Sequence, residues 1–105
     1  MTPEILTKLQ AVYSKARESM DPRVAADFPA EITEENYCET GSAMQLYSNH
    51  ILTVAIDPPF DRRMYQLATV YGLFGMVVRS VASEGSIGWQ NAVLGIIDVR
   101  LKGLN

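Results

Sequence analysis

The sequence contains few of the residue types that carry chemistry. It has one cysteine, Cys38, and one histidine, His50, among 105 residues. A single cysteine cannot form a disulfide within the chain. The first residues include Glu4 and Lys8, where a secretory signal would have an uninterrupted apolar core. These absences predict a reducing, cytoplasmic setting.

Basic residues are also few and scattered. The chain has nine Lys and Arg residues and a net charge of −3, and only Arg62 and Arg63 are adjacent. Proteins that bind nucleic acids or anionic membranes cluster their cations to neutralise phosphates, so we expect no direct phosphate contact. The longest apolar run, 64–78, is about five residues too short to span a bilayer. We therefore expect no membrane partner.

Catalytic and metal-binding motifs are missing as well. There is no Gly-x-Ser-x-Gly elbow, Walker loop or dinucleotide fingerprint. A structural zinc site uses four ligands, usually with paired Cys or His, whereas Cys38 and His50 could meet the acidic residues near them only through a kink near Gly41. We expect no catalytic residue, no metal ligand and no cofactor. An enzyme that uses Cys38 or the acidic cluster remains a third hypothesis for the function.

Apolar residues, by contrast, make up 48% of the chain and dominate one predicted helix, residues 58–83. Its main stripe recurs at alternating spacings of four and three, the coiled-coil period, through Phe60, Met64, Leu67, Tyr71, Phe74, Val78 and Val81. The opposite side is apolar too. A helix that is apolar on nearly all sides must be covered on nearly all sides, which is hard for a chain of this length to do alone. This helix therefore predicts self-association or the binding of a partner.

Three further helices are predicted around the central one. The first covers residues 3–20 and begins with Thr2 as N-cap and Pro3 in the first turn. A loop with room for one helical turn follows over 21–32. The last helix covers 86–102, with Ser86 as N-cap and with apolar residues at helical spacing, namely Trp89, Ala92, Val93, Ile96, Ile97 and Leu101.

The segment between these elements is harder to assign. Thr33 resembles a helix start, but the Thr-Gly-Ser sequence at 40–42 predicts a break near Gly41. Residues 42–56 fit a helix, while 50–56 also alternate as a strand would, which is the minority alternative. Asp57 and Pro58 are predicted to cap and open the central helix. The fold class is all-α, a four-helix bundle-like single domain over residues 1–105.

Small residues form a groove along the central helix. Ala68, Gly72 and Gly75 lie within about 60° of one another at 100° per residue. Glycine costs roughly 1 kcal/mol relative to alanine inside a helix, so the groove predicts the close approach of another helix, either of the same chain or of a partner. The predicted partner or dimer interface consists of Tyr65, Val70, Gly72, Leu73, Gly75, Met76 and Val77.

Negative charge is concentrated in residues 21–39, where six acidic side chains accompany Arg23 alone. One interpretation is a solvated loop and helix start in which acids favourably face the helix dipole. The other is a docking surface for a basic partner, whose association weakens as salt rises. The predicted docking surface consists of Asp27, Glu31, Glu34, Glu35 and Glu39.

Together these patterns favour a non-enzymatic, helical protein–protein interaction module. We expect it to act as an adaptor, regulator or inhibitor of another protein, and to form a homodimer. The alternative is a carrier or sensor that holds a small apolar ligand between helices, beside Ala68, Gly72 and Gly75.

Overall fold

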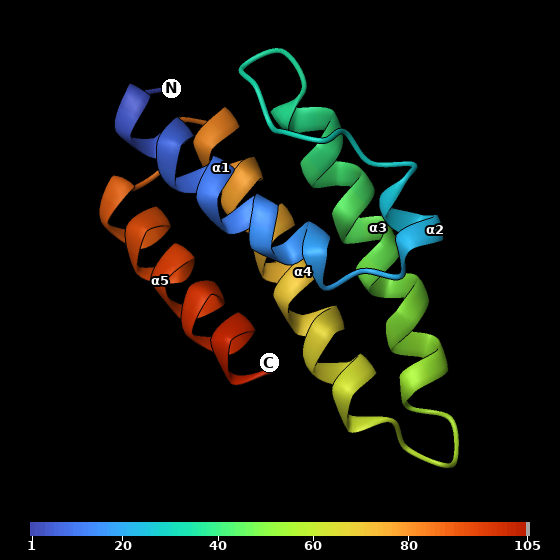
Figure 1. The fold of residues 1–105 in the computed structure, drawn as a ribbon. Coiled ribbons are helices and arrows are strands. Elements are labelled where there is room, and N and C mark those ends of the chain that lie inside the picture. The colour runs from blue at the N-terminus through green and yellow to red at the C-terminus, as the bar shows by residue number, and fades with distance from the viewer. Residues whose placement is uncertain (105) are drawn as a thin grey trace.

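The computed structural model describes residues 1–104, which form five helices and no strand (Figure 1). The all-α class predicted from the sequence is confirmed, and the strand alternative for residues 50–56 is wrong. The extra helix is a single turn within the predicted loop. The helices are α1 (Pro3–Glu18), α2 (Pro22–Ala25), α3 (Tyr37–Ala55), α4 (Arg62–Ala82) and α5 (Ile87–Gly103). Within these residues no helix is long and apolar enough to cross a bilayer.

Side-chain caps fix where α1 and α5 begin. The Thr2 hydroxyl accepts a hydrogen bond from the Ile5 amide at 3.3 Å, and Pro3 occupies the first turn. The Ser86 hydroxyl accepts one from the Trp89 amide at 3.2 Å. Both caps satisfy amides that have no partner inside the helix, and both predictions are confirmed.

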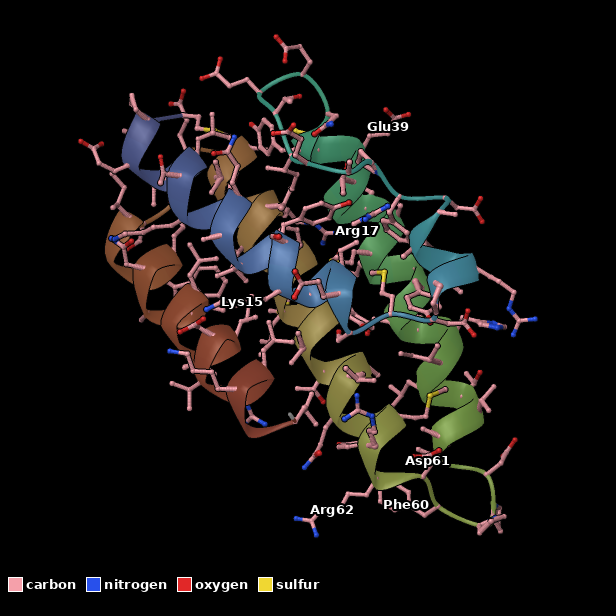
Figure 2. The ribbon with its side chains drawn as sticks, in the orientation of Figure 1. Lys15, Arg17, Glu39, Phe60, Asp61 and Arg62 are labelled. Carbon is pink, nitrogen blue, oxygen red and sulfur yellow. The ribbon has the colours of Figure 1, made fainter. Side chains whose placement is uncertain are left out.

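The predicted start of the central helix is wrong by four residues. Asp61, not Asp57, is the N-cap of α4, and its carboxylate accepts a hydrogen bond from the Met64 amide at 3.0 Å. The physical reason is the Pro58-Pro59 pair, because a residue that precedes proline is pushed out of the helical region. The chain therefore bends through residues 57–59, and the helix begins only after Asp61. Figure 2 shows Phe60, Asp61 and Arg62 at this turn between α3 and α4.

The predicted break near Gly41 is also wrong, because α3 runs through Gly41 without interruption. Gly41 is buried against α4, and a Cβ atom added to it would lie 2.5 Å from Val78 Cγ1. No side chain larger than hydrogen fits there without a shift. The glycine is therefore a packing position, and the close contact offsets its unfavourable helix propensity.

The same close approach extends along the whole pair of α3 and α4. A Cβ at Gly75 would lie 2.8 Å from Gln45 Cβ and 2.9 Å from the Gly41 carbonyl oxygen. Further along, the buried Ser48 hydroxyl donates a hydrogen bond to the Ala68 carbonyl at 2.5 Å. No other two helices of residues 1–104 are in such extensive contact. The small-residue groove of α4 is thus occupied by α3 of the same chain.

The other two long helices cover α4 through larger side chains. In Figure 1, α1 crosses in front of α4, with α3 on one side and α5 on the other. The rings of Tyr13 in α1 and Phe74 in α4 are both fully buried, with centroids 5.8 Å apart. α1 is held to α5 by an ion pair of 2.6 Å between Lys15 and Asp98. Three neighbours therefore cover three sides of α4.

Gln90 fixes the turn between α4 and α5. Its side chain is buried, and its amide nitrogen donates to the Ser80 hydroxyl at 3.1 Å and to the Gly85 carbonyl at 3.2 Å. At the other end of the pair, the Arg63 guanidinium donates to the Leu104 carbonyl at 2.8 Å. These bonds set α4 and α5 side by side and antiparallel.

Candidate functional site

The outward side of α5 carries an apolar stripe that no other helix covers. Trp89, Ala92, Ile96 and Val99 recur at spacings of three and four, and lie within about 80° of one another at 100° per residue. Trp89 is 41% exposed, Ile96 47% and Val99 68%. A separate stripe of α5 lines the core, consisting of Val93, Leu94, Ile97 and Leu101. α5 is thus apolar on two sides, of which only one is covered.

α4 contributes a second exposed stripe beside the first. Tyr65 and Met76 are exposed and Leu73 is half-buried. These three residues lie on the side of α4 away from Phe74, which packs against α1. In α5 the apolar stripe likewise lies about 130° round the helix from Asn91 and Asp98, which bind Lys8 and Lys15 of α1. Both stripes therefore face away from α1.

Because α4 and α5 lie side by side, their stripes form one surface, here named the α4–α5 apolar face. Its members are Tyr65, Leu73, Met76, Trp89, Ala92, Ile96 and Val99. Side chains of this size with about half their area exposed offer roughly 100 Å² each, so the five most exposed offer roughly 500 Å². That is near the upper end for the largest apolar patch on a monomer, where such patches are often functional.

Gly95 lies beside this face, about 40° round α5 from Val99 and about 100° from Ile96. A shallow hollow there is lined by Ala92, Gly95, Ile96, Val99 and Arg100. A Cβ atom added at Gly95 would have no atom within 4 Å, whereas Gly41, Gly72 and Gly75 all have a close neighbour in their own chain. Gly95 therefore weakens α5 by roughly 1 kcal/mol without a packing reason inside the chain.

Comparison of the chain with protein-family models, curated proteins and solved structures finds no match. The function of the α4–α5 apolar face must therefore be inferred from its own composition and geometry.

The structure divides the interface predicted from the sequence. Val70 and Val77 are fully buried in the core, and Gly75 is buried against α3, so these three offer no surface to a partner. That part of the prediction is corrected, because α1, α3 and α5 cover more of α4 than was expected. The exposed Tyr65 and Met76 remain candidates, as do the half-buried Leu73 and Gly72.

The exposed residues of α5 were missing from the predicted interface. The sequence pattern placed Trp89, Ala92 and Ile96 in one set with Val93, Ile97 and Leu101, and no interface was predicted there. The spacing alone could have separated the two groups. Trp89, Ala92, Ile96 and Val99 recur at spacings of three and four, so they form a complete stripe of their own.

The five residues of the predicted acidic docking surface are all exposed. Asp27, Glu31, Glu34 and Glu35 lie in the connection between α2 and α3, and Glu39 lies in the first turn of α3. Figure 2 shows the Glu39 carboxylate at this end of α3. Its position fits the favourable interaction of an acid with a helix N-terminus. Docking of a basic partner here stays a prediction.

Cys38 and His50 do not come together. Both are exposed on α3, and because the helix is unbroken they lie about 18 Å apart along its axis. A thiol and its base must be within hydrogen-bond distance, so the structure contradicts this pair as a nucleophilic site. Within residues 1–104, no three His, Cys, Asp or Glu side chains are grouped so that they could hold a metal ion.

A polar hollow of about 460 Å³ lies where the end of α1 meets the start of α4 and the end of α5. It is lined by Lys15, Glu18, Ser19, Arg63, Leu101 and Lys102. Its cations already have partners in the chain, since Lys15 and Lys102 both pair with Asp98, at 2.6 and 3.0 Å, and Arg63 binds the Leu104 carbonyl. The hollow therefore presents no unpaired cation to an anionic ligand.

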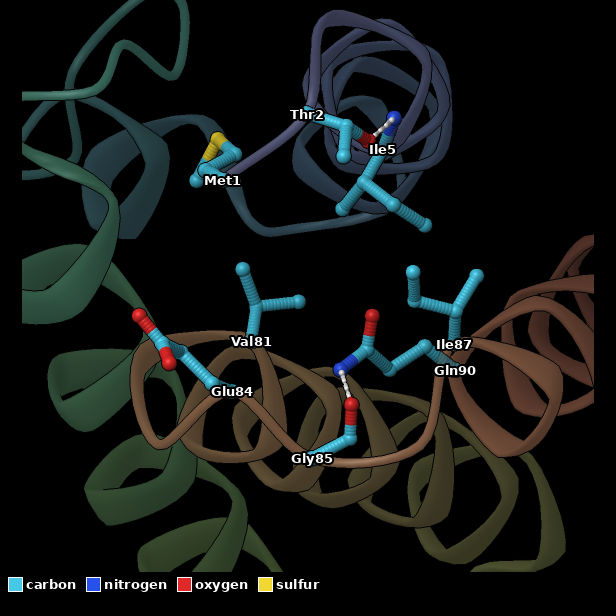
Figure 3. A pocket seen from close by; sticks show the side chains of 8 residues that line it. All are labelled: Met1, Thr2, Ile5, Val81, Glu84, Gly85, Ile87 and Gln90. Atoms are coloured by element: carbon cyan, nitrogen blue, oxygen red, sulfur yellow. Dashed lines mark hydrogen bonds between the residues drawn. The ribbon is translucent and has the colours of Figure 1, made fainter.

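The space predicted for a small apolar ligand is filled. Beside Ala68, Gly72 and Gly75 lie Gln45 and Ser48 of α3. A different hollow, of about 180 Å³, opens between the start of α1 and the turn from α4 to α5, where it is lined by residues that include Ile5, Val81 and Gln90 (Figure 3). Drug-sized ligands occupy about 300 to 1,000 Å³, so this hollow is small for such a ligand.

Tyr71 has the most strongly shifted titration near these hollows. Burial raises the pKa of its phenol to about 12, although a hydrogen bond of 2.7 Å with Ser19 acts in the opposite direction. The folded state therefore favours the neutral form of the phenol. The role of Tyr71 is therefore packing between α1 and α3, where its ring centroid lies 5.5 Å from that of Tyr47.

This shift predicts a loss of stability at high pH that depends on Tyr71. The unfolded phenol ionises near pH 10 and the folded one near 12, so the stabilisation is complete below pH 10 and is lost as the pH rises to 12. The expected loss is about 2 kcal/mol. Urea denaturation between pH 8 and 12 should show a shallower decline for Tyr71→Phe than for the wild type. Equal declines would contradict the assignment.

Proposed function

We propose that this protein is a non-enzymatic helical interaction module that forms a homodimer and acts as an adaptor, regulator or inhibitor of a partner protein. The observation that carries the proposal is the α4–α5 apolar face. Interfaces are enriched in Trp, Tyr and Met, and this face carries one of each, namely Trp89, Tyr65 and Met76.

The size of the face supports pairing of two copies. A stable interface buries about 800 Å² on each partner. The five most exposed side chains offer roughly 500 Å² of this, and the two other members of the face, Leu73 and Ala92, add to it. In the proposed dimer the acidic surface of each copy stays open to a basic partner, because its residues lie on α3 and the loop before it.

A charge placed in the middle of the face is expected to prevent pairing. Ile96→Glu would bury a carboxylate without a partner, which costs several kcal/mol in an apolar interface. We expect the dimer dissociation constant, measured by sedimentation equilibrium, to rise about a hundredfold or more.

Leu46→Glu is the matched control. Leu46 is 70% exposed on α3, away from the face, and is as apolar as Ile96. We expect this variant to dimerise like the wild type, and both variants to keep the wild-type helical content. A wild-type protein that stays monomeric at high concentration, or an Ile96→Glu variant that dimerises normally, would refute the proposal.

A further inference from the structure

We propose that the hollow of about 180 Å³ between the start of α1 and the turn from α4 to α5 binds a small neutral molecule. This ligand has an apolar body the size of one benzene ring and a single hydrogen-bond donor. The residues that line the hollow are not members of the α4–α5 apolar face, so this site goes beyond the proposed function and does not depend on it. The hollow combines one buried acceptor with apolar walls.

The acceptor is the side-chain oxygen of Gln90. This residue is only 3% exposed, and its amide nitrogen donates to the Ser80 hydroxyl and to the Gly85 carbonyl. A carbonyl can only accept, so the bond to Gly85 fixes which end of the side-chain amide is the nitrogen. The other end, Oε1, has no hydrogen-bond partner within residues 1–104 and points into the hollow (Figure 3).

The walls around this oxygen are apolar. Val81 of α4 and Ile87 of α5 lie on either side of Gln90 Oε1, and Ile5 of α1 lies across from it (Figure 3). A buried water makes about three hydrogen bonds, and these three side chains offer none. An acceptor that is buried without a partner lowers stability. A ligand that brings both a donor and apolar surface therefore suits this hollow better than water does.

The size of the hollow fits a single ring. An apolar cavity of about 150 Å³ is large enough to bind benzene, and this hollow is slightly larger.

The charge around the hollow restricts the donor. Glu84 is exposed at the mouth, and none of the described residues that line the hollow is Lys, Arg or His. A carboxylate or phosphate ligand would therefore meet a like charge and no cation. An ammonium group would lose its hydration in exchange for a neutral amide oxygen, which is costly. A neutral hydroxyl, as in a phenol or a cyclic alcohol, is the donor that fits.

Phenol and toluene are matched probes of this site, because they differ only in a hydroxyl that replaces a methyl group. A purely apolar hollow binds toluene more tightly, since burying a hydroxyl without a partner is costly. With Gln90 Oε1 as acceptor, we expect phenol to bind about threefold more tightly than toluene, at one site per chain in titration calorimetry. The NMR signals of the Gln90 side-chain amide should shift as phenol is added.

Three variants locate the binding. Ile87→Ala removes part of a wall but little of the core, because Ile87 is 54% exposed, and we expect it to bind phenol about threefold more weakly. Ile56→Ala is the matched control, since Ile56 is 58% exposed at the end of α3, beside the start of α4, and should bind phenol like the wild type. Gln90→Met removes the acceptor at nearly constant length, so toluene should then bind more tightly than phenol.

Tighter binding of toluene than of phenol to the wild type would overturn the inference. So would the absence of saturable binding of either probe, which would mean that the hollow takes up solvent only. Equal weakening by Ile87→Ala and Ile56→Ala would place the binding elsewhere and overturn it too. Melting curves show whether Gln90→Met folds, and if it does not, the wild-type order of the two probes and the Ile87→Ala variant still decide.

The two proposals fail separately. A dimer that binds no phenol would leave the proposed function standing, whereas a monomer that binds phenol would refute the homodimer alone.

Discussion

Replacing Gly75 with alanine is expected to destabilise the protein by about 3 kcal/mol. The added methyl would lie 2.8 Å from Gln45 Cβ and 2.9 Å from the carbonyl oxygen of Gly41. The second contact is with backbone, which cannot rotate away as a side chain can, so α3 and α4 must move apart. Alanine favours a helix by roughly 1 kcal/mol over glycine, which offsets only part of the strain. Urea denaturation measures the change in unfolding free energy.

Gly95→Ala is the matched control, because it makes the same substitution in the interior of another helix. Nothing lies within 4 Å of its added methyl, so the helix propensity of alanine acts alone. In dilute monomer we expect a gain of about 0.5 to 1 kcal/mol. The two substitutions should thus have opposite signs. If both stabilised the protein, the close packing of α3 against α4 would be wrong.

Phe74→Ala is expected to cost about 4 kcal/mol, a large part of the stability of a domain of this size. Phe74 is fully buried and its ring packs against Tyr13. The aromatic contact is a main link between α1 and α4, whose backbones come close to each other at only a few points. Removal of the ring leaves a cavity that the stiff helices on either side cannot close.

Phe60→Ala separates this effect from the loss of any phenylalanine. Phe60 is 58% exposed at the turn before α4, where it contacts Tyr65 with ring centroids 5.6 Å apart. We expect a cost below about 1 kcal/mol. Unfolding free energies in urea should therefore differ by about 3 kcal/mol between the two variants. Similar costs would mean that Phe74 is not the centre of the core.

The features that the sequence predicted correctly depend on residues close together in the chain. Thr2 and Ser86 cap the amides three residues ahead of them, so their patterns can be recognised without the fold. Gly41 is the opposite case. Its neighbour, Val78, is 37 residues away in sequence, so the glycine resembled a helix breaker until the packing of α3 on α4 was known.

The candidate site was predicted in part for a similar reason. Periodicity shows that α4 and α5 are apolar on more than one side, but it does not show which side a neighbour covers. Val70 and Val77 were predicted at an interface and are buried, while Trp89 and Ile96 were not part of that interface and are exposed. Only the arrangement of α1 over α4 separates these cases.

The contacts between α3 and α4 also restrict how this molecule can move. Gly41 receives Val78, and Gly75 receives Gln45, so each helix carries both a protrusion and a notch. Sliding by one helical turn, about 5.4 Å, would drive Val78 onto Tyr37 or Gln45. The pair of α3 and α4 therefore cannot undergo shear, in which packed helices slide past each other. A partner that reshapes the protein must swing α1 or α5, while α3 and α4 serve as its fixed frame.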